Sequence, residues 1–164
     1  MRIDVSVLRP GSAGQAWPPP DFAHCVAIRT QVFVQGQGVS MEEEIDGLDP
    51  ECVHLLARVD AAPVGTARLR RKGGDAKAER VAVLEVHQRA GIGSALMRAL
   101  ESEARRMRLP RVILHAQLRA VPFYESLGYV AFGPVFDEAE IPHRKMERRL
   151  GTAETRTRDA DPGS

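Results

Sequence analysis

A glycine-rich turn joins an apolar segment to an amphipathic one near the middle of the 164-residue chain. The apolar segment, 78–84, predicts a strand, and Ile92, Leu96 and Leu100 then repeat along one face of a helix. Between them lies Gln88-Arg89-Ala90-Gly91-Ile92-Gly93-Ser94. Glycines let the backbone approach a ligand closely, and a helix N-terminus presents N–H groups that lack partners. The turn therefore predicts either an anion site suited to a pyrophosphate or a connection that needs glycine only for its backbone angles.

The apolar periodicities elsewhere predict an α/β fold with a mixed sheet. Along the chain they indicate strand, helix, three strands, helix, strand, helix and two strands. The predicted strands are 3–8, 53–59, 64–69, 78–84, 112–116, 129–132 and 143–149, and the predicted helices are 22–36, 91–107 and 121–127. Such a fold has a central sheet of about six to seven strands flanked by helices.

Stretches rich in polar or helix-breaking residues separate these elements. The stretch 10–20 is expected to be a loop because of its prolines and glycines, and the stretch 42–51 because it is strongly acidic. Residues 1–150 are long enough for one domain with its own core. Residues 151–164 are polar and aperiodic, which predicts a disordered C-terminal tail.

Composition excludes several classes of protein. Apolar residues make up 43% of the chain and the formal net charge is +1, so no nucleic-acid or membrane partner is expected. No apolar run reaches the ~18 residues of a membrane span, and residues 1–20 do not resemble a secretory signal. The two cysteines, Cys25 and Cys52, fit neither a disulfide framework nor a metal site. We therefore expect a cytoplasmic protein without a metal.

Two widespread phosphate-binding motifs do not fit the glycine-rich turn. A dinucleotide-binding turn needs glycine or alanine where Leu96 stands, and a P-loop needs lysine and a hydroxyl residue after its second glycine. Gln88, Gly91 and Gly93 instead match (Q/R)xxGx(G/A), the acetyl-CoA signature of the GNAT acetyltransferases, a superfamily that the chain resembles. The segment 120–129, Ala-Val-Pro-Phe-Tyr-Glu-Ser-Leu-Gly-Tyr, is similar to that family's second motif. The resemblance extends over residues 22–149.

Within this superfamily the chain resembles the ElaA/YjcF-like subgroup. The resemblance lies in two segments outside the acetyl-CoA motifs, 32–49 and 136–146. The residues that carry it are Val32, Phe33, Val34, Gln37, Gly38, Val39, Glu42, Glu44, Asp46, Asp49, Phe136, Glu138, Ile141, Pro142, His143 and Met146. The chain differs from the subgroup at Gln35, Gly36 and Glu140, on the side expected to bind the substrate.

The resemblance implies a single-domain GNAT fold that binds acetyl-CoA between strands 78–84 and 112–117, which splay apart. The backbone of 81–83 would pair with pantetheine, and an N–H near Val83 would polarise the thioester carbonyl. The turn 88–94 would bind the pyrophosphate. The cofactor-binding residues implied in this way are Val81, Ala82, Val83, Gln88, Arg89, Ala90, Gly91, Ile92, Gly93, Ser94, Ala120, Phe123 and Tyr124.

Acyl transfer to an amine needs an acid and a base. Tyr124 is the predicted acid, because a phenol can protonate the departing thiolate; the alternative is an amphipathic core residue. Glu79 is a predicted base, because strand alternation places it on one face with Val81 and Val83. The alternative for Glu79 is an ordinary ion pair with a neighbouring arginine, such as Arg70 or Arg80.

Two histidines are rival bases, because an unperturbed imidazole titrates near neutral pH. We assign His143 to catalysis and His115 to substrate binding; the alternative for each is a packed, hydrogen-bonded strand residue. Glu44 and Asp46 in the acidic stretch would attract a cationic amine, or the stretch is simply a solvated loop.

The predicted function is direct transfer of an acetyl group from acetyl-CoA to an amine of a small molecule or protein. A ternary complex is expected, because neither cysteine is a convincing nucleophile. Two alternatives stay open: a non-catalytic CoA-binding sensor or regulatory module, and a phosphate-binding domain unrelated to CoA. The sequence also leaves open the acceptor, the acyl length and whether a homodimer forms.

Overall fold

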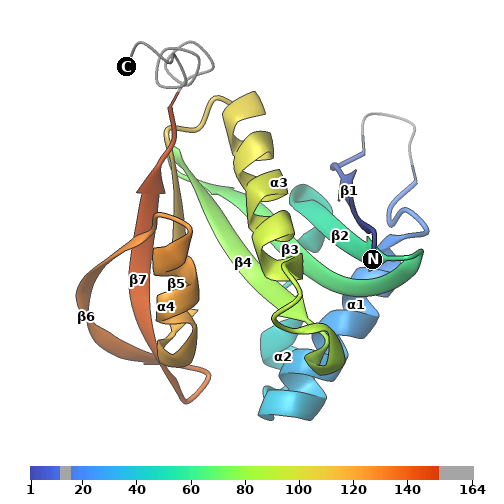
Figure 1. The fold of residues 1–164 in the computed structure, drawn as a ribbon, viewed down its shortest axis with the longest axis horizontal. Coiled ribbons are helices and arrows are strands. Elements are labelled where there is room, and N and C mark those ends of the chain that lie inside the picture. The colour runs from blue at the N-terminus through green and yellow to red at the C-terminus, as the bar shows by residue number, and fades with distance from the viewer. Residues whose placement is uncertain (12–15, 152–164) are drawn as a thin grey trace. The chain divides into compact units, whose positions relative to one another are not determined.

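Seven strands and four α-helices make up the part of the chain that the computed structural model describes, residues 1–11 and 16–151 (Figure 1). The strands are β1 (Ile3–Leu8), β2 (Val53–Val59), β3 (Ala62–Lys72), β4 (Asp75–Val83), β5 (Arg111–Gln117), β6 (Val130–Glu138) and β7 (Ile141–Arg149). The helices are α1 (Phe22–Arg29), α2 (Met41–Glu44), α3 (Ile92–Arg106) and α4 (Val121–Ser126). The sheet order is β1-β2-β3-β4-β5-β7-β6, which confirms the predicted α/β class and element order.

The contacts of the chain divide it into two compact units. The first comprises Met1–Arg70 and Ala78–Leu100, and the second comprises Arg71–Lys77 and the chain from Glu101 onward. The hairpin between β3 and β4 therefore belongs to the second unit, and α3 begins in the first unit and ends in the second. The splay predicted between 78–84 and 112–117 involves both units and stays a prediction.

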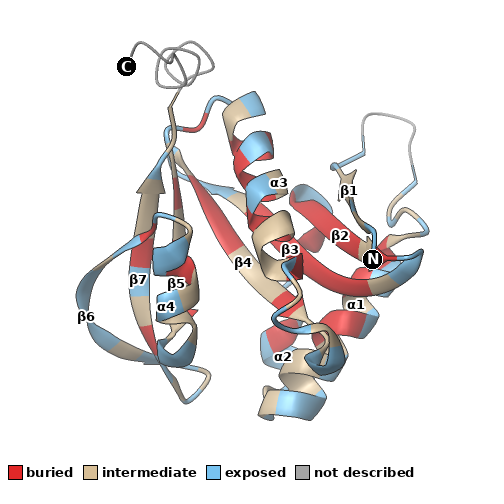
Figure 2. Cartoon of the chain, in the orientation of Figure 1, coloured by how far each residue is buried: buried red, intermediate tan, exposed pale blue. Residues whose placement is uncertain are grey.

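In the first unit, β1, β2 and β3 form an antiparallel meander. Leu56 lies opposite Ser6 on one side and Thr66 on the other. The β2–β3 turn is formed by Asp60 and Ala61, whose φ angles of 48° and 77° match the two left-handed positions of a tight hairpin. β2 is buried at every position except Arg58, as expected for a strand covered on both faces (Figure 2).

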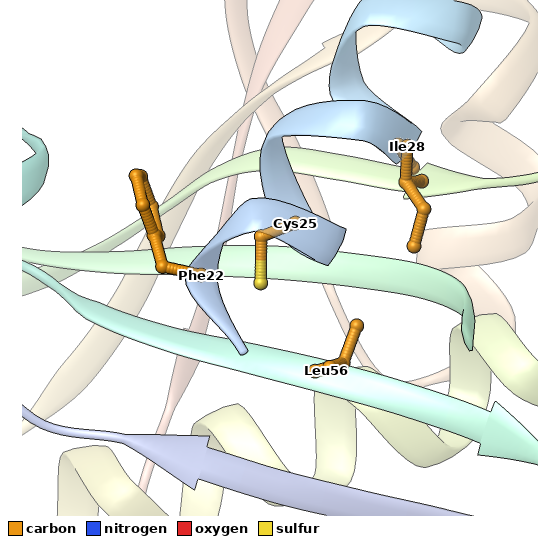
Figure 3. Packing of buried hydrophobic residues seen from close by; sticks show 5 residues of the cluster. Phe22, Cys25, Ile28 and Leu56 are labelled. Carbon is orange, nitrogen blue, oxygen red and sulfur yellow. The ribbon is translucent and has the colours of Figure 1, made fainter. Parts of the chain in front are cut away.

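The core of the first unit lies where α1 packs on the sheet (Figure 3). Phe22, Cys25 and Ile28 repeat at helical spacing along α1 and meet Leu56 of β2 and Ala82 of β4. The N-terminal part of α3 packs very closely on β3. A Cβ atom at Gly65 would lie 3.0 Å from Ile92 Cγ2 and 3.1 Å from Leu96 Cδ1, which is tighter than ordinary packing and favours glycine at this position.

In the second unit, β5, β7 and β6 are antiparallel neighbours. β5 alternates cleanly, with Val112, Leu114 and Ala116 buried and the intervening side chains half-buried. Beside it, the Tyr129 hydroxyl donates to Glu101 Oε2 at 2.8 Å, and Arg148 Nη1 donates to Glu101 Oε1 at 2.5 Å. These bonds satisfy a carboxylate of α3 that is only 3% exposed.

Three details differ from the sequence prediction. The acidic stretch contains α2 rather than only loop, because Ser40 caps it: Ser40 Oγ accepts from the Glu43 N–H at 3.1 Å. The helix that begins at Phe22 continues from Thr30 to Gln35 as a wider π-helical segment. Several strands are longer than predicted, β3 and β6 most of all. The predicted tail lies outside the described residues from position 152, and the predicted domain boundary stays a prediction.

Candidate functional site

The turn after β4 is held by one main-chain and one side-chain hydrogen bond. The Leu84 N–H donates to the Val64 carbonyl at 2.9 Å, which fixes the end of β4 beside β3. After the short helical turn Glu85–His87, the Gln88 side chain donates back to the Val83 carbonyl at 3.2 Å. Gln88 therefore closes the turn on the strand end, which is a physical reason for a side-chain donor at this position.

The backbone of the same turn fits an anion. Gly91 has φ of +84°, and a Cβ placed there would meet nothing within 4 Å, so the position is both left-handed and open. The first hydrogen bond of α3 runs from the Ala95 N–H to the Gly91 carbonyl at 3.1 Å. The N–H groups of residues 92–94 consequently have no acceptor within the helix. Ile92 contributes only backbone, because its side chain is buried.

Arg80 interrupts the regular alternation of β4. Its φ of +54° is left-handed, although it stands in the middle of a strand. Glu79 contacts Arg68 of β3. Arg68 lies two residues after Thr66 and therefore on the same face of β3, and Thr66 is paired with Leu56, which packs against α1. Glu79 thus lies on the face of the sheet that α1 covers. Ala82, rather than Val81 or Val83, packs with Leu56 on that face. The predicted grouping of Glu79 with Val81 and Val83 was therefore wrong, because the left-handed residue shifts the pattern by one.

Glu79 belongs to a set of interlocked ion pairs in the first unit. Arg68, whose side chain is completely buried, donates to Asp46 Oδ2 at 2.8 Å, to Asp49 Oδ1 at 3.0 Å and to Glu79 Oε1 at 2.8 Å. Arg70 donates to both oxygens of Glu79, at 2.9 and 3.1 Å. Glu79 is thus the ion-paired residue that the sequence offered as the alternative, with Arg70 as one of its partners. Its proposed action as a base stays a prediction.

Arg29 and Arg80 bind the acidic stretch from two other directions. Arg29 donates to Glu44 and, at 2.9 Å, to Asp49 Oδ1, and its side chain is buried. Arg80 Nε lies 2.9 Å from Glu44 Oε2, and Arg80 Nη2 donates to the Glu44 carbonyl at 3.2 Å. We call these residues the arginine–carboxylate network: Arg29, Arg68, Arg70, Arg80, Glu44, Asp46, Asp49 and Glu79.

The network has clear electrostatic consequences. Hydrogen bonds from Arg68 hold the pKa of Asp46 far below its ordinary value. Burial raises the pKa of Asp49, but hydrogen bonds and charge from Arg29 and Arg68 outweigh it, and the net pKa is lowered. Glu44 and Asp49 are therefore buried ion-pair partners, at 4% and 8% exposure, whereas Glu42, Glu43 and Glu51 of the same stretch are exposed. The predicted substrate contacts of Glu44 and Asp46 stay predictions.

In the second unit, Tyr124 lies on α4 with only 7% of its surface exposed. Its ring packs edge-on against Phe123 and Tyr129, with centroids 4.9 and 5.8 Å away. Burial raises the pKa of the Tyr124 phenol well above its ordinary value. The phenol is consequently un-ionised at neutral pH, and its hydroxyl can donate a hydrogen bond. Ala120 precedes α4 as its N-terminal flanking residue.

His115 and His143 come together around a carboxylate that the sequence analysis gave no role, Glu138. His115 Nδ1 lies 2.9 Å from Glu138 Oε1, and His143 Nε2 lies 3.7 Å from Glu138 Oε2. The ring of Phe136 on β6 lies edge-on to the His115 ring, with centroids 5.0 Å apart, and is stacked on the His143 ring, with centroids 5.9 Å apart. In the sequence, Phe136 and Glu138 stand two residues apart, which places them on one face of a strand. Which histidines they face depends on how that strand pairs with its neighbours, and the spacing alone does not give this register.

The predicted site residues thus form separate groups. Glu44, Asp46 and Glu79 meet in the first unit, which also holds the turn 88–94. His115 and His143 meet in the second unit, which also holds Tyr124. Within residues 1–11 and 16–151, no helix is both long and apolar enough to span a membrane. Over the same residues, no three His, Cys, Asp or Glu side chains are grouped to hold a metal ion.

Comparison with known proteins identifies similar chains. The profile described as the acetyltransferase (GNAT) domain matches residues 24–150. The chain is 44% identical to YjcF of Bacillus subtilis, named as an uncharacterized N-acetyltransferase, over 73% of this chain and 86% of YjcF. An acyl-CoA N-acyltransferase from Pseudomonas aeruginosa has a similar crystal structure, with a TM-score of 0.75, 29% identity and coverage of 90% and 99%. For Escherichia coli ElaA the TM-score is 0.74, with 25% identity and coverage of 90% and 99%.

Proposed function

The chain belongs to the GNAT acetyltransferase family, and from this membership we propose that it transfers an acetyl group from acetyl-CoA to an amine. The observation that carries the proposal is the family match over residues 24–150, which includes the open, left-handed turn at Gly91. A phosphate-binding domain unrelated to CoA is disfavoured by the same match. The amine is borne by a small molecule or a protein, and we place the reaction in the cytoplasm.

We propose that the turn 88–94 binds the pyrophosphate of CoA through backbone N–H groups. Residues 92–94 supply amides without intrahelical acceptors at the positive end of the α3 dipole, and Gly91 leaves room for the phosphates. The backbone of 81–83 is proposed to pair with the pantetheine arm. Ala120, Phe123 and Tyr124 remain proposed cofactor contacts on the basis of the family motif.

Direct attack of the amine on the thioester is proposed rather than a route through an acyl-cysteine. Burial raises the pKa of the Cys52 thiol to about 11, and burial also raises the pKa of Cys25. Both thiols are therefore overwhelmingly protonated at neutral pH, whereas the thiolate is the nucleophilic form. The Cys52 thiol in addition donates to the Leu48 carbonyl at 3.2 Å.

Tyr124 is the proposed acid for the departing CoA thiolate, on the basis of its place in the family motif. His143 and Glu79 are the proposed bases from the sequence. Both oxygens of Glu79 accept hydrogen bonds from arginines, so this carboxylate is already engaged in ion pairs. The histidine side of the site is therefore the better candidate for the base.

The test is acetyl transfer itself. The full chain is mixed with acetyl-CoA and, separately, a polyamine, an aminoglycoside and a lysine peptide, and both free CoA thiol and acetylated product are measured. Product formed in step with free thiol supports the proposal. Tight CoA binding by calorimetry without turnover on any amine would instead favour the CoA-sensor alternative, and preference for nucleotides over CoA would contradict both.

A further inference from the structure

We infer that Glu138 and His115 form a carboxylate–imidazole dyad whose free ring nitrogen, His115 Nε2, takes a proton from the attacking amine. The inference rests on the proposed acetyl transfer and assigns its base. In this dyad His115 is the catalytic residue, and Glu138 is a positioning residue that acts through it. The sequence offered His115 and His143 as rival bases and favoured His143, with His115 assigned to substrate binding.

The hydrogen bond between the two residues determines where the proton of the imidazole sits. A carboxylate oxygen can only accept, so the 2.9 Å contact requires that His115 Nδ1 carry a proton and donate it to Glu138 Oε1. In the neutral ring, Nε2 must then bear the lone pair. The geometry thus places the basic nitrogen away from the carboxylate, as in other histidines that a carboxylate orients for proton transfer.

His143 is fixed in a different way. Its Nδ1 lies 2.6 Å from the Ile141 carbonyl oxygen, which can only accept, so Nδ1 again carries the proton. Its Nε2 therefore points its lone pair toward Glu138 Oε2 at 3.7 Å. The His143 side chain is 7% exposed against 19% for His115. His143 is accordingly the more enclosed ring, with its basic nitrogen already directed at the carboxylate.

His115 and the proposed acid lie on neighbouring elements of the second unit. His115 is half-buried on β5, between buried Leu114 and Ala116. Tyr124 lies on α4, which follows β5 and contacts it (Figure 1). Nucleophile and leaving group occupy different positions around the carbonyl carbon. The reaction therefore needs a separate base and acid, and these two elements carry one candidate each.

Acetyl transfer by these residues accounts for every proton and for the carbon–sulfur bond that breaks. His115 Nε2 takes one proton from the ammonium, and the amine nitrogen then forms a bond to the acetyl carbonyl carbon. The carbon–sulfur bond breaks, and the thiolate takes the Tyr124 phenol proton. The second ammonium proton replaces the one that Tyr124 gave, and the His115 imidazolium releases its proton to water. Glu138 stays ionised throughout and stabilises the imidazolium.

Two lysines lie near the dyad or act on it through their charge. Lys145 lies opposite His115 across the β5–β7 register, and Lys77 of β4 acts on Glu138 through its charge. Hydrogen bonding from His115, followed by the charges of the histidines and Lys77, lowers the pKa of Glu138 despite its partial burial. Glu138 is therefore an anion at neutral pH.

The experiment compares three variants by their pH profiles of kcat/KM for the amine. Glu138→Gln removes the charge that favours the imidazolium, so we expect the rising limb to move to lower pH by about one unit or more. Its kcat should fall roughly 10-fold or more as the imidazole becomes a weaker base. His115→Gln should lower kcat by roughly 100-fold and abolish the limb. Asp137→Asn, an exposed charge loss in the same strand, should change neither.

The KM for acetyl-CoA should stay unchanged in all three variants. Imidazole nitrogen NMR on the wild-type chain should show neutral His115 with its proton on Nδ1, and Glu138→Gln should lower its titration midpoint. The dyad is overturned by an unchanged His115 titration in Glu138→Gln, or by a limb that His143→Gln abolishes and His115→Gln retains. Wild-type protein that binds acetyl-CoA but acetylates no amine would contradict the proposed function, and the NMR titration would still decide the dyad.

Discussion

Arg68 Nη2 lies 2.8 Å from Glu79 Oε1, and the Arg68 side chain has no exposed surface. The same guanidinium also binds Asp46 and Asp49, so one buried cation joins β4 to the segment that follows α2. Formation of such a network exchanges a large desolvation cost for several charge-assisted hydrogen bonds. Removal of one partner leaves the others as uncompensated buried charges.

Truncation of this arginine should therefore be costly. We expect Arg68→Ala to lower the free energy of unfolding by about 3–5 kcal/mol, measured by urea denaturation. The matched control is Arg2→Ala, which removes an ion pair to Asp4 at 3.3 Å between largely exposed side chains. The control should be close to neutral. A similar small effect in both variants would mean that the network adds nothing to stability.

The network should also make the fold sensitive to acid. The folded-state pKa values of Asp46 and Asp49 are depressed, so the unfolded chain binds protons more readily than the folded one. The associated stability is fully present above the unfolded aspartate pKa of about 3.9 and is lost as pH falls below it. Thermal melts between pH 7 and 3 should show a falling midpoint only in the acid range. Asp46→Asn should flatten this fall, and an equally steep fall in that variant would contradict the assignment.

A side chain at the left-handed glycine of the turn should weaken CoA binding. Gly91→Val adds bulk where the phosphates must approach, and we expect the Kd for CoA to rise at least roughly 10-fold by calorimetry. Gly38→Val is the matched control, because Gly38 also has positive φ, +73°, and open space around its Cβ position. Valine is strained at both positions because both have positive φ. An equal loss of CoA affinity in the two variants would therefore mean that the strain weakens binding through the fold and that position 91 does not contact the phosphates.

The phenol of Tyr124 should contribute to turnover and little to folding. Tyr124→Phe keeps the ring contacts with Phe123 and Tyr129, and we expect kcat to fall roughly 100-fold with unchanged KM for acetyl-CoA. Tyr129→Phe is the contrasting variant. It breaks the buried bond to Glu101 and should cost about 1–3 kcal/mol of stability without a comparable fall in kcat. Normal turnover in Tyr124→Phe would mean that the Tyr124 hydroxyl takes no part in catalysis and that the ring serves only in packing.

The sequence predicted the elements and the turn well, because apolar spacing and glycines report local structure. Gln88, Gly91 and the face of α3 lie where the pattern placed them. It failed at Arg80, because arginine does not favour positive φ and its presence therefore does not predict a left-handed backbone. It also failed to place Glu138, because its pairing with His115 depends on which residues of β6, β7 and β5 lie side by side. The apolar spacing of one segment predicts its own secondary structure, but it does not predict the register in which that segment pairs with distant strands.

The close approach of α3 to β3 at Gly65 has a consequence for how this protein can vary. The nearest atoms to a Cβ there belong to the side chains of Ile92 and Leu96, in the first turns of the helix that follows the turn 88–94. At 3.0 and 3.1 Å these contacts are tighter than ordinary packing, so an added carbon requires the two side chains to shift, and a shift that reaches the helix backbone also moves the amides that precede it. In a random-mutagenesis screen for lost cofactor affinity, position 65 should therefore score as intolerant although its residue has no side chain and offers the ligand no contact of its own.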